Sequence, residues 1–332
     1  PQLSCLVGDL PECPRMVLYV FLFFLGLLVL YLGAEGLVQG ASSIALQYGI
    51  RPVIVGLTVV ALGTSMPEFL VNFFALLSGE STLAIGNIIG SNISNVALIL
   101  GACAMTLPLA VAPEVLKREY PVMLGVMVLF YVCALDGVIG TWDGVLMVLI
   151  LLGLGAYVFY DARRTTTATI LESMEGEVDS TDPELSTTAK SMYVLGGMGG
   201  LALGAHLMVD NAVAIADLMG IDHVVIGLTV VAIGTSLPEL AASMVGTLKQ
   251  EAGMTVGNVM GSNLLNVLFV VGTLSIAEPI AVDPNTLRLH FPVMLGFCAL
   301  VVPLTWTDHE ISRGEGALMV ACFAGYMVYL YL

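Results

Sequence analysis

The chain has 332 residues, of which 58% are hydrophobic and 11% charged, and its mean hydropathy is +0.97. This composition excludes a water-soluble domain and indicates a polytopic membrane protein. The formal net charge of -16 argues against a nucleic-acid partner.

Long apolar segments recur along the whole chain. In the first half they predict membrane-spanning helices near residues 17–47, 53–78, 82–107, 121–136 and 143–160. In the second half they predict spans near residues 192–219, 225–248, 253–276, 292–307 and 315–332. Only helices and closed barrels satisfy the backbone in lipid, and the segments lack the alternation of barrel strands. We therefore predict an all-α fold with ten transmembrane helices.

A polar stretch at residues 161–190 separates the two sets of spans. It carries seven acidic residues among Ser and Thr, without the spacing of a calcium-binding loop. We interpret it as an acidic cytoplasmic linker. The predicted organisation is an outer N-terminal segment at 1–15, a first five-helix repeat at 16–160, the linker, and a second five-helix repeat at 191–332.

The two halves share sequence at a constant offset of 171 residues. Positions 56–68 and 227–239 are identical at eleven of thirteen places and end in GTSMPE and GTSLPE. GNIIGSNISN at 86–95 matches GNVMGSNLLN at 257–266, and PVMLG occurs at 121–125 and again at 292–296. Such self-similarity indicates an internal duplication.

Five spans per repeat is an odd number, so the second repeat enters the membrane in the opposite orientation. Inverted repeats of this kind are typical of transporters. With the N-terminus outside, eight of the ten Lys and Arg residues fall in inner loops. The positive-inside rule therefore favours a cell-membrane protein with both termini outside. This places Cys5 and Cys13 together in the outer segment and leaves a disulfide between them open.

The duplicated motif places a carboxylate at the same position of an apolar span in each repeat, at Glu68 and Glu239. A charged side chain at the bilayer centre costs at least about 2.5 to 3.5 kcal/mol, and no Lys or Arg lies in these spans. The compensating positive charge must come from a bound cation or a proton.

Oxygen donors surround both glutamates in the sequence. Pro67 and Gly63 predict a helix break near 61–65 that frees backbone carbonyls, and Pro238 and Gly234 repeat it. The carbonyl candidates are Ala61, Thr64, Ala232 and Thr235, and the hydroxyl of Ser65 is expected near the carboxylate. The following span adds Asn87, Ser91 and Asn95, repeated as Asn258, Ser262 and Asn266, while Gly86, Gly90, Gly257 and Gly261 allow close helix approach. This all-oxygen set suits calcium or sodium rather than zinc.

The paired motifs resemble the two alpha-repeats of the cation/calcium exchanger superfamily, most closely its small prokaryotic sodium/calcium exchangers. The resemblance implies an antiporter that exports calcium by inward sodium movement, commonly three sodium ions per calcium. It implies that Glu68 and Glu239 are shared calcium and sodium ligands, supported by carbonyls of Thr64 and Thr235. Flanking sodium sites would comprise Ala61, Ser65, Ser91, Ala232, Ser236 and Ser262. Asn95 and Asn266 match a central position where some relatives carry Asp, which lowers the expectation of potassium coupling.

Other functions stay open at this point. A carboxylate exchanges a metal for a proton as readily as for sodium, so calcium/proton antiport is the runner-up. An intramembrane enzyme would use Ser65 or Ser236 with His206, and a passive cation channel is a third alternative. Glu35, His206 and Asp210 are left outside the site. The expected partners are calcium and sodium ions as substrates and the lipid bilayer, with no cofactor and no obligatory protein partner.

Overall fold

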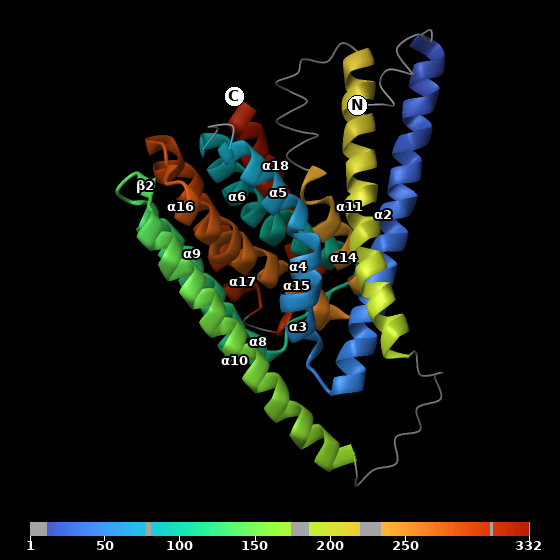
Figure 1. Cartoon of the computed structure of the whole chain (residues 1–332), viewed down its shortest axis with the longest axis vertical. Coiled ribbons are helices and arrows are strands. Elements are labelled where there is room, and N and C mark those ends of the chain that lie inside the picture. Colours follow the sequence, from blue (N-terminus) through green and yellow to red (C-terminus); the bar gives the residue numbers. More distant parts are fainter. Residues whose placement is uncertain (1–11, 78–80, 174–185, 220–233, 306–307, 332) are drawn as a thin grey trace.

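The computed structural model describes residues 12–77, 81–173, 186–219, 234–305 and 308–331. Over these ranges the chain is a bundle of helices with four two-residue strands (Figure 1). The prediction of an all-α polytopic membrane protein is confirmed.

The first half begins with the long helix α2 (Glu12–Tyr48). The second span of this half is made of α3 (Pro52–Val55), η1 (Gly56–Val60), α4 (Ala61–Thr64) and α5 (Met66–Leu77), where η marks π-helical turns. The third span is made of α6 (Ser81–Ser94), η2 (Asn95–Leu100) and α7 (Gly101–Thr106). The short β1 (Leu109–Ala110) and α8 (Pro113–Lys117) lead to α9 (Glu119–Ala134), β2 (Val138–Ile139) and α10 (Thr141–Ser173).

The second half repeats this order. It comprises α11 (Thr187–Leu218), α14 (Leu237–Leu248), α15 (Ala252–Leu265), η4 (Asn266–Val271), α16 (Gly272–Ala277), β3 (Ile280–Ala281), η5 (Thr286–His290), α17 (Phe291–Leu304), β4 (Glu310–Ile311) and α18 (Arg313–Tyr331). Among the described residues, six helices are long and apolar enough to cross a membrane, and a bent pair of helices makes a seventh span. The other predicted spans correspond to the 16-residue α9, to α14 and to α18.

The helix ends depart from the prediction at the central linker. Helix α10 continues to Ser173 and α11 begins at Thr187, so both ends of the predicted 161–190 linker are helical. Figure 1 shows α10 extending beyond the rest of the bundle. Hydropathy marks where a helix leaves lipid, but the backbone hydrogen-bond ladder does not have to end there.

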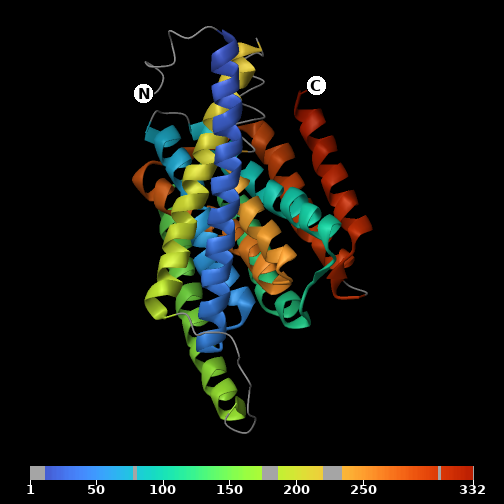
Figure 2. The ribbon, with the colours of Figure 1, turned by 90° about the vertical axis from the view of Figure 1, so that its right-hand side faces the viewer.

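Helices α2 and α11 form an antiparallel pair at one side of the bundle (Figures 1 and 2). Gly26 of α2 lies against Gly204 of α11, and Gly40 of α2 lies against Val194 of α11, so the two helices run in opposite directions. Because these helices are equivalent in the two repeats, their antiparallel arrangement agrees with the predicted inversion. Their closest approach is at glycines, where the backbones meet.

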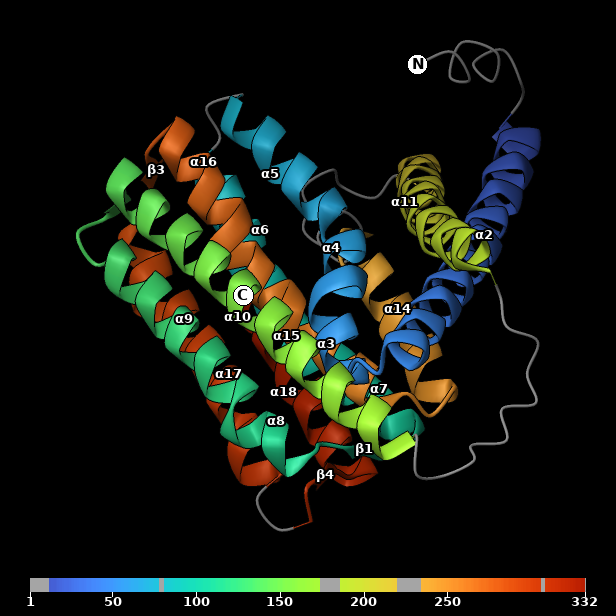
Figure 3. The ribbon, with the colours of Figure 1, turned by 60° about the horizontal axis from the view of Figure 1, so that its bottom comes forward.

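The third span of each repeat lies at the centre of the molecule. In an apolar 18-residue stretch of Ala84–Thr106 and of Ala252–Ala277, 72% and 78% are buried, compared with 17% in such a stretch of Arg15–Tyr48. In Figure 3, α15 and α16 are flanked by α10 on one side and by α3 to α5 on the other. These third spans, which carry the repeated GNIIGSNISN and GNVMGSNLLN segments, are therefore well shielded from lipid.

Two small antiparallel sheets join the repeats at their ends. Strand β1 pairs with β4 through Leu109 and Ile311, and β2 pairs with β3 through Ile139 and Ile280. Each sheet takes one strand from each repeat, so the repeats interlock instead of folding as separate units.

Candidate ion-binding site

The predicted helix break is present in the first repeat, and in the second repeat a new helix begins at the equivalent position, Leu237. Helix α4 ends at Thr64 and α5 begins at Met66, with a bend of 45° between the two arms. The intervening Ser65 has φ -87° and ψ 3°, and its counterpart Ser236 has φ -90° and ψ 4°. Pro67 has no N–H to donate to the carbonyl one turn earlier, which explains the break at this position. Glu68 and Glu239 thus lie in the first turn of the new helix.

The described site candidates are all buried. They are Ala61, Thr64, Ser65, Glu68, Ser91, Asn95, Thr235, Ser236, Glu239, Ser262 and Asn266. Ala232 lies outside the described residues. Both glutamates are only 1% exposed, so their carboxyl groups have little access to solvent that would stabilise a charge.

The two carboxyl groups face each other across the boundary between the repeats. The Ser65 hydroxyl donates to Glu239 Oε1 at 2.9 Å, and Glu239 also interacts with the side chains of Glu68 and Thr64. Within the described residues, ion pairs join Arg51 to Glu119, His206 to Asp210 and Lys249 to Glu35, and neither motif glutamate takes part. The pair therefore lacks a cationic side chain to balance it.

Unpartnered buried oxygens gather on the repeated motifs. Among the described residues, eight buried side-chain atoms have no hydrogen-bond partner, and seven of them belong to predicted site residues. These seven are Glu68 Oε2, Glu239 Oε2, Ser91 Oγ, Ser262 Oγ, Ser236 Oγ, Asn95 Oδ1 and Asn266 Oδ1. Native interiors leave few polar atoms unpaired, so such a set points to a missing ligand. Oxygen atoms alone suit a hard cation.

The element packing brings these oxygens together. The π-helical turn that starts at Asn95 packs against α14, which carries Glu239, and the turn that starts at Asn266 packs against α5, which carries Glu68. Single π-helical turns inside α-helices are frequent at functional sites. Gly257 and Gly261 sit directly against Val53 and Leu57 of the broken span, as expected for close helix approach. At Gly86 and Gly90 an added Cβ meets nothing within 4 Å, and the equivalent facing residues fall in the undescribed range 220–233.

Further polar residues hold the backbone around the glutamates. Asn72 Nδ2 donates to the Glu68 carbonyl at 2.7 Å, and Asn87 donates to Asn72 Oδ1 at 3.2 Å. In the second repeat Asn258 donates to Ser243 Oγ at 2.9 Å and to the Glu239 carbonyl at 3.4 Å. Asn72 and Ser243 were missed from the sequence, although each lies one turn after its glutamate. Asn87 and Asn258 support the site through hydrogen bonds.

The Ala61 carbonyl is engaged within the helix. It accepts from the Ser65 N–H at 2.9 Å and from the Thr64 hydroxyl at 3.3 Å. The break therefore does not free this carbonyl as expected. Pro67 instead removes the helical donor for Gly63, four residues earlier.

The other singled-out polar residues lie elsewhere. His206 Nε2 and Asp210 Oδ2 are 3.3 Å apart within α11, with side chains 71% and 59% exposed. Glu35 pairs with Lys249 at 3.5 Å. Cys5 lies outside the described residues, as does any disulfide to Cys13. His206 is exposed, whereas Ser65 and Ser236 are buried and the Ser65 hydroxyl bonds to Glu239. Among the described residues, no hydrogen bond joins either serine to His206 as an intramembrane enzyme would need.

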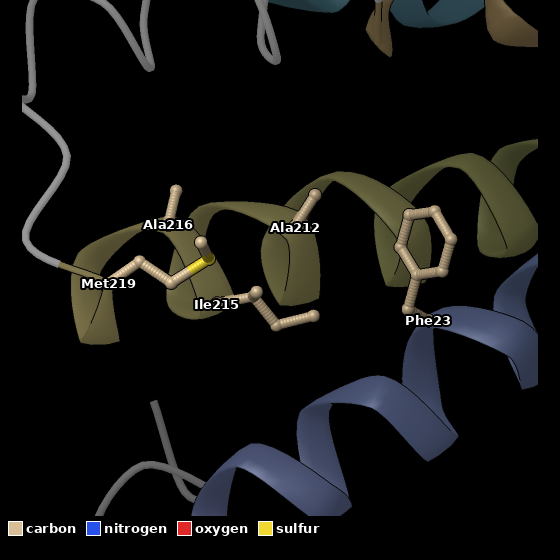
Figure 4. A pocket seen from close by; sticks show the side chains of 5 residues that line it. All are labelled: Phe23, Ala212, Ile215, Ala216 and Met219. Atoms are coloured by element: carbon tan, nitrogen blue, oxygen red, sulfur yellow. The ribbon is translucent and has the colours of Figure 1, made fainter.

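An apolar cavity of about 280 Å³ lies between α2 and α11 (Figure 4). Its lining residues are Phe23, Ala212, Ile215, Ala216 and Met219, and their side chains present only carbon and one thioether sulfur. Such a lining has no oxygen ligand for a hard cation. The cavity is therefore unrelated to the oxygen-rich centre.

Comparison with known proteins gives consistent matches over the whole chain. The sodium/calcium exchanger protein family matches residues 18–160 and 191–332. CaxA of Alkalimonas amylolytica is 35% identical over 95% of this chain and 99% of its own. The inner membrane protein YrbG of Escherichia coli K12 is 34% identical over 95% and 98%. A solved structure of the sodium-calcium exchanger NCX_Mj, soaked with sodium and without calcium, is 30% identical with a TM-score of 0.80, covering 94% of this chain and 99% of that one.

Proposed function

Because the chain belongs to the sodium/calcium exchanger family, we propose that it is an antiporter that exports calcium in exchange for inward sodium. Family membership makes the protein a multi-pass membrane transporter and not an enzyme. The coupling ion, the direction of transport and the individual ligands are the proposal.

One observation carries it, the seven unpartnered buried oxygens on the two repeated motifs. Calcium takes six to eight oxygen ligands in proteins, and two carboxylates balance its charge of +2. Sodium is also a hard cation that binds neutral oxygens. A site with two carboxylates, three hydroxyls and two amide carbonyls therefore suits either ion.

We assign the central carboxylates Glu68 and Glu239 to both ions. The carbonyls of Thr64 and Thr235 are assigned beside these carboxylates, and Asn95 and Asn266 to the centre. Ser65, Ser91, Ser236, Ser262 and the backbone of Ala232 are assigned to flanking sodium positions. Ala61, whose carbonyl already accepts two hydrogen bonds, is left out of the set. Calcium and sodium would compete for the same carboxylates, so each excludes the other. Competition of this kind couples the two fluxes, provided that only a loaded site switches between the sides of the membrane.

The inverted arrangement supplies a physical route for the switch. The antiparallel pair α2 and α11 contacts the remaining bundle mostly through α14 and the start of the second span. We propose that this pair slides against the bundle, which holds the ions. We also propose that both termini lie outside, as the distribution of Lys and Arg favours.

The test is calcium flux in proteoliposomes. Vesicles loaded with sodium and diluted into sodium-free medium should take up radiolabelled calcium, and Glu239→Gln should abolish the uptake. A second set of vesicles carries a proton gradient and no sodium. Calcium uptake driven by protons and indifferent to sodium would replace sodium/calcium exchange with calcium/proton antiport. Flux that needs no counter-ion would indicate a channel.

A further inference from the structure

We infer that Asn92 and Asn263 are positioning residues of the ion site, each holding an amide of the opposite repeat with its carbonyl oxygen free for the ion. Asn263 acts on Asn95, and Asn92 acts on Asn266. The inference rests on the proposed function, because it concerns the ligands of the same site. Neither residue belongs to the polar stripe that the sequence singled out.

The hydrogen bonds run across the repeat boundary in matching pairs. Asn95 Nδ2 donates to Asn263 Oδ1 at 3.0 Å, and Asn266 Nδ2 donates to Asn92 Oδ1 at 3.3 Å. All four side chains are buried, with exposures of 0% or 1%. In each pair the amide nitrogen of the site residue is bonded, while its carbonyl oxygen has no partner.

The direction of these bonds decides what Asn95 and Asn266 offer to a cation. A side-chain amide has an oxygen acceptor at one end and two N–H donors at the other, and a half-turn exchanges them. A cation is attracted by the oxygen end and repelled by the N–H end. Anchoring the nitrogen to a neighbouring carbonyl therefore leaves the oxygen as the exposed end.

The anchors are oriented in their turn by methionines. Asn92 Nδ2 lies 3.9 Å from Met294 Sδ, and Asn263 Nδ2 lies 4.0 Å from Met123 Sδ. A thioether sulfur is a weak acceptor and never a donor, so it favours the N–H end of the amide beside it. Asn263 Nδ2 also reaches the Asn92 carbonyl at 3.5 Å. The oxygen end of each anchor is then turned towards its site residue. Met123 and Met294 are the methionines of the repeated PVMLG segments, which the site otherwise leaves unexplained.

The chain of contacts alternates between repeats. Met294 of the second repeat faces Asn92 of the first, which holds Asn266 of the second. The first-repeat ligand Asn95 is held in the mirrored way. Each repeat therefore controls a ligand of the other, and the site is complete only when the two repeats are packed together.

The experiment measures calcium binding to the purified full-length protein by titration calorimetry. Asn92→Leu keeps the approximate size but removes the acceptor for Asn266, so its amide is free to turn. We expect calcium affinity to fall roughly 10- to 100-fold, as when outer-shell partners of metal ligands are removed. Asn92→Asp keeps an acceptor oxygen and should not lose affinity. Ser275→Ala is the matched control, because Ser275 is equally buried and its hydroxyl donates to the Gly272 carbonyl of its own helix.

A second experiment, in an Asn266→Asp background, separates loss of ligand positioning from a general loss of structure. Asn266→Asp carries oxygen at both ends of the side chain, so its orientation no longer matters. In that background Asn92→Leu should leave calcium affinity unchanged, whereas a merely structural role would lower it again. The same loss in both backgrounds, or no loss in either, overturns the inference. If Asn92→Leu does not fold, Asn263→Leu with Asn95→Asp makes the mirrored test. Absence of calcium and sodium binding by the unchanged protein would instead refute the proposed function.

Discussion

Glu68 and Glu239 each keep one carboxylate oxygen buried and unpartnered, which is costly without a bound cation. We predict that Glu68→Gln and Glu239→Gln each lower calcium transport by more than about 100-fold, because losing a direct ligand costs more than losing an outer-shell partner. The measurement is sodium-driven calcium uptake in proteoliposomes. Glu310→Gln removes an exposed carboxylate of strand β4 that lies outside the motifs, and this variant should transport normally. Equal activity of all three variants would contradict the assignment.

The motif serines differ between the repeats, although their sequences match. Ser65 donates to Glu239 Oε1 at 2.9 Å, whereas Ser236 Oγ is buried without a partner. In ion-free protein, Ser65→Ala should reduce the free energy of unfolding by about 1 to 3 kcal/mol, because it removes a buried hydrogen bond to a carboxyl group. Ser236→Ala should leave it unchanged or raise it, since no bond is lost.

Thermal unfolding in detergent, without sodium or calcium, checks this difference. Adding calcium should then stabilise the parent protein more than Ser236→Ala, because the variant has lost a proposed ligand. Equal melting temperatures of the two alanine variants in ion-free buffer would contradict the asymmetry.

At this scale the sequence singles out the proposed ligands but not the residues that support them. The duplication and the cost of a charge in lipid single out Glu68 and Glu239 without any structure. The supporting role of Asn92 and Asn263 was not predicted, because each follows the serine of its polar stripe and lies on a helix face that the sequence assigns to packing. Their role depends on which residue of the other repeat they meet, and one repeat read alone does not contain that information.

The broken second span shows which features of a helix are determined by the residues within one turn. Proline and glycine predict the break at Ser65 because they act on the backbone within one turn. The π-helical turns at Asn95 and Asn266 carry no such residue, and their sequences read as ordinary helix. Hydropathy and propensity therefore do not predict them. The same limit explains why α10 was expected to end near residue 160.

Close contact between α2 and α11 depends on individual glycines. A Cβ on Gly197 would lie 2.8 Å from the Gly33 carbonyl oxygen and close to the Leu37 backbone, whereas a Cβ on Gly196 meets nothing within 4 Å. We predict that Gly197→Ala destabilises the protein by about 1 to 3 kcal/mol, as overpacking does, and slows transport. Gly196→Ala, on the same helix, should be neutral in both.

Thermal unfolding and uptake rates of the two variants make the comparison. A slower transport rate with unchanged calcium affinity in Gly197→Ala would place the effect on the movement of the pair and not on the site. Identical behaviour of the two alanine variants would show that this contact does not limit either property.

The whole molecule joins its repeats at three levels. The small sheets pair β1 with β4 and β2 with β3, the Ser65 hydroxyl of one repeat bonds to Glu239 of the other, and the asparagines exchange hydrogen bonds across the boundary. The sequence predicts two halves and their inversion because repeats and span counts are visible in one dimension. It does not predict their interlocking, because the side-chain hydrogen bonds join residues 168 to 174 positions apart and the paired strands belong to opposite repeats.

Net charge movement is a property of the complete cycle. If three sodium ions enter for each calcium that leaves, one positive charge crosses the membrane, which is worth about 2.3 kcal/mol per 100 mV. The calcium gradient sustained at equilibrium should then change about 50-fold for each 100 mV, since every 1.4 kcal/mol is tenfold.

Proteoliposomes clamped at different potassium diffusion potentials, with fixed sodium on both sides, make the measurement. A calcium distribution set by exchange should become steeper as the side that receives sodium is made more negative. Two sodium ions per calcium would move no net charge, and the distribution would then be independent of voltage.

Because Asn95 and Asn266 contribute no charge, the two glutamates alone must balance both the calcium-loaded and the sodium-loaded states. A three-sodium state would therefore carry one uncompensated positive charge through the membrane, and the voltage dependence would arise in the sodium-loaded step.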